Sequence, residues 1–277
     1  MKEGIFMELL SPKMDFIFKQ IFEDSSKKEV IISFLNAILN PTKENIIINV
    51  LFRPNDSYLK LKMEVITKNK KKMNIEIQIN SELSIPKNVL YYCENCNRSL
   101  LEDDNILDLH NKTIYINILN FAYLDDYTNF HTIFKVKEEY KDLTDIVEIH
   151  FIEFPKFKGI KNKTQLTSWC EFLNNPISPK VRELEREITE IEMAMDTLVK
   201  LNSDEKQRRI YEIREKRFFD ERSAINTAIK GNQKREKLRI AKNLLDILDD
   251  ETIALKTELK IEEIKKLRKE NSNSLKN

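Results

Sequence analysis

Glu76 and Gln78 are the first residues of this chain whose types and spacing could do chemistry. They lie in the run Met73–Asn80, which reads MNIEIQIN, so that apolar residues alternate with Asn74, Glu76 and Gln78. Alternate residues of a strand point to opposite faces, so the run predicts a strand with one face on a core and one polar face. Polar residues on such a face are usually only solvated, so the pattern alone is a weak signal of function.

A second acid, Glu64, lies on the preceding strand-like run, Leu59–Ile66, and a short lysine-rich link predicts that the two runs form a hairpin. In one register Glu64 faces Glu76, with Cβ atoms about 5 Å apart. Two such carboxylates could bind Mg²⁺, which can ionise a water for attack on a phosphodiester. In the register shifted by two residues, Lys62 faces Glu76, and its ammonium group sits where the cation belongs. The sequence leaves both registers open.

The elements that would position this hairpin alternate between helical and strand-like patterns. Helical spacing covers Asp15 to about Phe22 and about Ser26–Leu39. Other strand-like runs are Ile46–Phe52, Thr113–Leu119 and Ile146–Phe154, and a further helix-like stretch covers about Asn88–Leu101. This order predicts an α/β fold built on a mixed central sheet with flanking helices.

The character of the chain changes near Pro176 and Pro179, beyond which almost every segment has helical periodicity. We therefore expect one domain over residues 1–178 and a charged helical region over residues 179–277. Within that region, KGNQKREKLRIAK has six basic residues and one acidic residue. The basic residues are Lys230, Lys234, Arg235, Lys237, Arg239 and Lys242. Gly231, at the start of this segment, is a candidate helix break.

Two interpretations of this basic segment remain. As one face it would bind DNA phosphates without sequence preference, with an affinity that falls steeply as salt rises. The simpler interpretation is a set of solvated helix faces with ion pairs between neighbouring turns.

Composition excludes several classes of protein. The chain has 277 residues, a formal net charge of +1 and 41% hydrophobic residues, enough for one sizeable core and a second unit. Apolar runs of signal-peptide or membrane-span length do not occur, so we expect a cytoplasmic protein that does not enter a membrane. The odd number of cysteines does not indicate a disulfide framework. Cys93 and Cys96 have the spacing of half a zinc site, but a shared helix face is the simpler interpretation.

Six short motifs occur in the order and spacing typical of one family. They are LLSPKMDFIFKQIF (Leu9–Phe22), ISFLNAIL (Ile32–Leu39), NIEIQ (Asn74–Gln78), LYY (Leu90–Tyr92), INILNF (Ile116–Phe121) and EIHFIEFPKF (Glu148–Phe157). In these motifs the chain resembles the recombination-promoting nuclease and transposase family of the PD-(D/E)XK superfamily. The resemblance covers about residues 7–175, and IREKRFFDE, IAKNLLDIL and IEEIKKL resemble the family's helical end.

The resemblance implies a restriction-endonuclease-like sheet and a cytoplasmic DNA endonuclease that requires Mg²⁺ or Mn²⁺ and acts in recombination or on mobile elements. It implies that Glu76 is the metal-binding Glu of the family. Gln78 stands where the superfamily more often has Lys. Asp15 and Lys19 match a first-helix motif and would support the site.

One departure from the family pattern affects catalysis. The family's first catalytic acid lies in a pattern like LDVKA, whereas this chain reads LKMEV, with Lys62 at the Asp position. If Glu64 replaces that acid as a catalytic and metal-binding residue, the site is active; if Lys62 faces Glu76, it is degenerate. The alternative function is a non-catalytic DNA- or protein-binding scaffold that acts through its C-terminal helices. Self-association as a homo-oligomer is compatible with either function.

Overall fold

The structure is a computed structural model, which describes residues 9–54, 60–80, 112–135, 137–138, 141–142, 147–158 and 162–274. The helix expected over Asn88–Leu101, together with Cys93 and Cys96, lies outside the described residues. The chain divides into two compact units, Met1–Arg208 and Arg209–Asn277. Among the described residues, none of the helices is both long and apolar enough to span a membrane.

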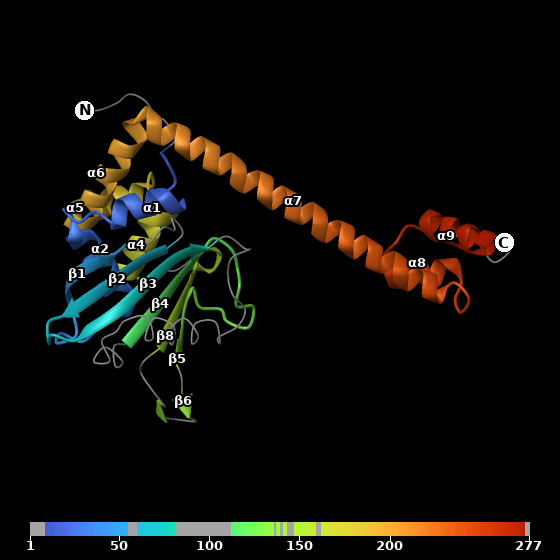
Figure 1. The fold of residues 1–277 in the computed structure, drawn as a ribbon, viewed down its shortest axis with the longest axis horizontal. Helices are drawn as coiled ribbons and strands as arrows, with labels where there is room; N and C mark the ends of the chain where they lie inside the picture. Colours follow the sequence, from blue (N-terminus) through green and yellow to red (C-terminus); the bar gives the residue numbers. More distant parts are fainter. Residues whose placement is uncertain are drawn as a thin grey trace. The chain divides into compact units, whose positions relative to one another are not determined.

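The first unit contains a six-stranded mixed sheet in the order β1-β2-β3-β4-β8-β5 (Figure 1). The strands are β1 (Ile47–Arg53), β2 (Lys60–Thr67), β3 (Lys72–Asn80), β4 (Lys112–Leu119), β5 (His131–Lys135) and β8 (Val147–Glu153). β1, β2 and β3 are antiparallel, β3, β4 and β8 are parallel, and β5 is antiparallel to β8. Two short strands, β6 (Lys137–Glu138) and β7 (Lys141–Asp142), pair separately. The expected mixed α/β sheet is therefore confirmed.

Burial explains why the strand patterns differ. On β2 and β3 the alternating residues Leu61, Met63, Ile75 and Ile77 are each at most 2% exposed, so these strands bury one apolar face. All described positions of β8 are buried, as are the last six of β4. Parallel strands covered on both faces read as nearly continuous apolar runs, which is how both appear in the sequence.

Helices α1 (Asp15–Phe22), α2 (Lys28–Leu39) and α4 (Gln165–Asn174) lie against the sheet, with α1 touching β2 and α2 touching β1 (Figure 1). Four aromatic side chains join them: Phe18, Phe22, Phe34 and Trp169 are each at most 1% exposed. The rings of Phe22 and Phe34 are 4.8 Å apart at their centroids, and Phe34 and Trp169 are 5.6 Å apart. This cluster holds the first two helices and a helix from far along the chain in one core.

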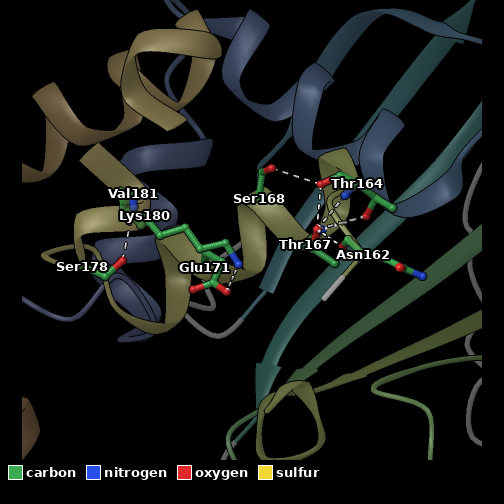
Figure 2. A network of polar contacts seen from close by, with 8 residues as sticks. All are labelled: Asn162, Thr164, Thr167, Ser168, Glu171, Ser178, Lys180 and Val181. Carbon is green, nitrogen blue, oxygen red and sulfur yellow. Dashed lines mark hydrogen bonds and ion pairs between the residues drawn. The ribbon is translucent and has the colours of Figure 1, made fainter. Parts of the chain in front are cut away.

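Side-chain caps set where the next helices begin (Figure 2). Thr164 accepts a hydrogen bond from the Thr167 backbone N–H (3.1 Å), and the Thr167 hydroxyl accepts one from the Thr164 N–H (2.8 Å), which starts α4. Ser178 caps α5 (Pro179–Glu187), and Lys180 forms an ion pair with Glu171 of α4. α5 and α6 (Thr189–Ser203) therefore pack within the first unit, although the sequence analysis assigned them to the C-terminal helical region.

The second unit contains most of α7 (Glu205–Leu244), followed by α8 (Asp250–Thr257) and α9 (Ile261–Ser274). A small apolar core joins the end of α7 to the two later helices; it comprises Ala241, Leu245, Ile253, Leu259, Ile264 and Leu267. α7 continues through Gly231, so the expected helix break is wrong. One exposed glycine costs a helix about 1 kcal/mol relative to alanine, which is too little to interrupt good helix formers on both sides.

Candidate functional site

The pairing of β2 with β3 decides what surrounds Glu76. Lys62 lies opposite Glu76, Glu64 lies opposite Asn74, and Lys60 lies opposite Gln78. The register that would place Glu64 opposite Glu76 is therefore wrong. Lys62, at the position where the resemblance implies an acid, lies directly across from Glu76.

The turn between the two strands explains this register. The Thr67 backbone N–H donates to the Lys71 carbonyl (3.0 Å), and the Thr67 hydroxyl accepts from the Lys71 N–H (3.0 Å). Only residues 68–70 remain to turn the chain, and Lys70 adopts the left-handed region with φ of 64°. A short loop with one left-handed residue is a standard hairpin connection, and its length fixes the register of the strands that follow.

Both carboxylate oxygens of Glu76 have a lysine partner. Lys60 Nζ lies 2.6 Å from Oε1, and Lys62 Nζ lies 3.6 Å from Oε2. The Glu76 side chain is 14% exposed and that of Lys60 21% exposed, whereas Lys62 is 48% exposed. The shorter ion pair is therefore the more shielded from water, and shielding strengthens the attraction between its charges. Sequence reasoning identified Lys62 but missed Lys60, whose contact with Glu76 follows only from the register.

Glu64 belongs to a different ion-pair group. Arg53 Nη2 lies 3.0 Å from one of its oxygens and Lys72 Nζ 3.2 Å from the other. Burial raises the pKa of Glu64, but the hydrogen bonds and charges of Lys72 and Arg53 outweigh burial and hold that pKa below its ordinary value. Glu64 is thus a carboxylate that is already neutralised by partners from β1 and β3.

These contacts test whether the residues present fit a divalent cation. Mg²⁺ binds one or two carboxylates together with water and phosphate oxygens. Here the carboxylate of Glu76 is shared by two ammonium groups, and Glu64 is held elsewhere. Among the described residues, no group of three His, Cys, Asp or Glu side chains is placed to hold a metal ion. The donor set around Glu76 does not fit Mg²⁺ or Mn²⁺.

The residues expected to support the site lie on α1. Asp15 accepts a hydrogen bond from the Phe16 backbone N–H (2.7 Å), and Lys19 pairs with Glu23 one turn later (3.3 Å). These contacts are local to the helix. A role for Asp15 and Lys19 at the site stays a prediction.

The six basic residues expected to contact DNA all lie on α7, but their contacts differ. Lys234 forms an ion pair with Glu263 of α9 (2.7 Å), and Lys237 forms one with Glu258, the residue that follows α8 (2.5 Å), so both bind the segment that follows α7. Arg239 pairs with Glu236 on its own helix. Arg235 donates to the Asn232 side chain, and Lys230 and Lys242 are exposed.

A buried polar cluster that sequence reasoning missed lies on β8 and β5. His150 is 0% exposed; its Nε2 is 2.8 Å from Glu148 Oε1, and its Nδ1 is 2.9 Å from His131 Nε2. Lys112 and Lys135 place ammonium groups 2.5 and 3.5 Å from the other Glu148 oxygen. In the sequence, the one sign of this cluster is that Glu148 and His150 are two residues apart on one predicted strand. His131 joins them only because β5 pairs with β8.

The cluster controls the protonation of its members. Burial raises the pKa of Glu148, but hydrogen bonds from His150 and Lys112 outweigh it and lower that pKa to about 2. Burial and the neighbouring His150 lower the pKa of His131 to about 4. Because the ionised Glu148 only accepts hydrogen bonds, His150 donates to it from Nε2.

Comparison with known proteins adds one match. A family model described as "PD-(D/E)XK nuclease family transposase" matches residues 12–228, which run from just before α1 into α7 and include the β2–β3 hairpin. The chain matches no curated protein and no solved structure at a significant level.

Proposed function

Because the chain belongs to the PD-(D/E)XK nuclease transposase family, we propose that it binds DNA through a nuclease fold in which lysine ammonium groups replace the divalent cation. PD-(D/E)XK nucleases generally use divalent metal ions. The observation that carries the proposal is the pair of ammonium groups on Glu76, from Lys60 and Lys62. A divalent cation at this carboxylate would have to displace both groups or remain beside two positive charges.

The same residues suit a DNA phosphate. Lys60, Lys62 and Glu76 together carry a net positive charge, and Gln78 lies opposite Lys60, two residues after Glu76 on the same face of β3. Lysine ammonium groups bind phosphate as point charges. The basic segment Lys230–Lys242 of α7 is the proposed second contact with the phosphate backbone.

A second candidate function is the Mg²⁺- or Mn²⁺-dependent DNA endonuclease of recombination or mobile elements that the resemblance implies. One observation favours it. Lys60 lies opposite Gln78, the position where the superfamily more often has Lys, and its Nζ reaches the Glu76 carboxylate. Lys60 could therefore supply the amine that position 78 lacks.

One pair of assays separates the two functions. Supercoiled plasmid is incubated with the protein in Mg²⁺ or Mn²⁺, with EDTA and the Glu76→Ala variant as controls, while anisotropy measures binding to a labelled duplex in EDTA. We expect duplex binding without metal, and plasmid that stays supercoiled. Metal-dependent nicking that disappears in both controls would overturn the proposal and establish the endonuclease. Failure to bind DNA under any condition would overturn both functions.

A further inference from the structure

The charges of α7 are distributed unevenly around the helix. α7 has 13 Lys and Arg residues against 6 Asp and Glu residues, a net charge of +7 (13 − 6), and residues 216–236 are exposed except for Ile225. Each residue turns an α-helix by about 100°, so residues at successive intervals of three and four share one face. On one such face lie Arg214, Arg217, Arg235, Arg239 and Lys242, with Glu221 as the acidic residue among them.

We propose that this face, called the α7 basic face, is a contact surface for duplex DNA and lies in the major groove. The proposal rests on the proposed function, because it names the form of DNA bound and the helix face that binds it. The proposal also divides the six basic residues of the segment Lys230–Lys242, which the sequence alone groups together. Lys234 and Lys237 project from another side of α7, where they hold Glu263 and Glu258, so they serve the chain's own packing.

Charge complementarity selects the occupant. A second copy of α7 would bring another net positive helix against this one, which is repulsive, whereas a nucleic acid backbone supplies a row of negative charges. Two residues of the face form exposed ion pairs on α7 itself, Arg217 with Glu221 and Arg239 with Glu236, and Arg235 donates to Asn232. Such pairs contribute little to stability, so phosphate groups can replace their carboxylates.

The shape of the face favours a duplex over a single strand. Between the basic ends, Ala224, Ala228 and Gly231 follow one another at intervals of four and three residues, and all three are exposed. A Cβ atom added at Gly231 would meet nothing within 4 Å, so packing within the chain does not require a glycine there. The major groove of B-DNA, about 12 Å wide, admits an α-helix of about 10–12 Å diameter when the side chains facing its floor are small.

The length of the basic face and the residues around it agree with α7 lying in the major groove. Arg217 and Arg235 are separated by 18 residues, which is five turns or about 27 Å, so the two can reach phosphates on either side of a groove segment. Phe218 and Phe219 are exposed, but Phe219 lies on another side of α7 and Phe218 only borders the basic face, one turn after Arg214, so no aromatic residue lies within the face itself. Single strands are usually bound by aromatic side chains stacked on bases, and A-form RNA has a major groove too narrow to admit side chains.

The test uses the full chain and a labelled 30-base-pair DNA duplex, with anisotropy measured over a range of KCl concentrations. Arg217→Gln with Arg235→Gln removes two charges from the basic face. Lys216→Gln with Arg222→Gln removes two charges from other sides of the same helix. We expect the first double variant to weaken binding about tenfold and to reduce the slope of log affinity against log salt by about 2. The second should weaken binding less than about threefold.

A steric pair tests the groove contact independently of charge. Ala228→Leu adds bulk to the centre of the basic face, and Asn226→Leu adds bulk to another side; leucine is a good helix former, so neither substitution should interrupt α7. We expect only Ala228→Leu to weaken binding. Equal effects of the two variants within either pair would overturn the inference while the proposed DNA binding stands. So would a wild-type protein that binds the matching single strand or double-stranded RNA more tightly than the DNA duplex. A wild type that binds no nucleic acid would overturn both.

Discussion

The ammonium group of Lys62 lies 3.6 Å from Oε2 of Glu76, across the pair formed by β2 and β3. A carboxylate at the Lys62 position would create an acidic pair whose repulsion a divalent cation relieves. A lysine at that position neutralises Glu76 instead, and Lys60 reinforces this at the other oxygen. The side chain at position 62 therefore decides whether Glu76 faces a second carboxylate or an ammonium group on the same backbone.

Lys62→Asp should give the chain a divalent-cation site. The variant places two carboxylates opposite one another on adjacent strands, with Lys60 as the one remaining ammonium group of the pair on Glu76. We expect Mn²⁺ binding, measured as loss of the free Mn²⁺ electron paramagnetic resonance signal, where the wild type shows none at the same concentration. Lys62→Ala, which removes the ammonium without adding a ligand, should bind much less Mn²⁺. Equal Mn²⁺ binding by the wild type would contradict this assignment of Glu76.

Lys70→Gly should stabilise the hairpin that sets this register. Lys70 has φ of 64°, a left-handed conformation that costs a non-glycine residue about 1 kcal/mol and glycine almost nothing. Part of the gain is lost to the greater freedom of glycine in the unfolded chain, so we expect about 0.5 kcal/mol of stabilisation. Urea unfolding followed by circular dichroism measures it. Lys68→Gly, two residues earlier in the same turn, is the control; a larger gain there would argue against strain at Lys70.

Phe34→Ala should strongly destabilise the first unit. Phe34 is 0% exposed and contacts the rings of Phe18, Phe22 and Trp169, so truncation leaves a cavity between helices from both ends of the unit. We expect a loss of about 3–5 kcal/mol in the free energy of unfolding. Ile133→Ala on the edge strand β5, where the side chain is 45% exposed, should lose less than about 1 kcal/mol. Similar losses in both variants would show that the aromatic cluster is not the centre of this core.

Local patterns predict most of the fold but only part of the site. The alternation in β2 and β3 assigns Glu64 and Glu76 to the polar face, because side-chain direction depends only on the strand period. The register of the hairpin depends instead on the conformation of three turn residues. Lys70 adopts a left-handed conformation in this turn, but lysine is not a residue type that indicates such a conformation in a sequence. Strand β5, with the short sequence HTIFK and no strict alternation, is not recognisable alone.

Contacts between distant segments account for the rest of the difference. The partner of Glu76 that sequence reasoning missed, Lys60, follows from the register. His131 and His150 are 19 residues apart and meet because β5 pairs with β8. Gly231 suggests a break when it is considered alone, but the helix-forming residues on both sides carry α7 through it.

The buried histidine cluster predicts that acid destabilises the first unit. In the unfolded chain His131 titrates near its ordinary pKa of 6.5, whereas in the folded chain burial lowers that pKa to about 4. Between these values the unfolded state binds a proton that the folded state does not, so stability falls as pH falls. Glu148 acts in the same direction at lower pH. Its pKa is about 2 in the folded chain and 4.5 in the unfolded chain, so between these values the unfolded state binds a proton that the folded state does not.

The expected loss from His131 between pH 7 and pH 4 is on the order of 3 kcal/mol, since each unit of pKa difference corresponds to about 1.4 kcal/mol. Urea unfolding at half-unit pH steps measures it. His131→Gln keeps a hydrogen-bonding side chain near His150 but does not titrate, so the stability of this variant should change much less over this range. Glu44→Gln, at an exposed pair with Lys68, is the control and should retain the wild-type profile. A His131→Gln profile as steep as the wild type would mean that other groups govern acid sensitivity, and would remove His131 from that role.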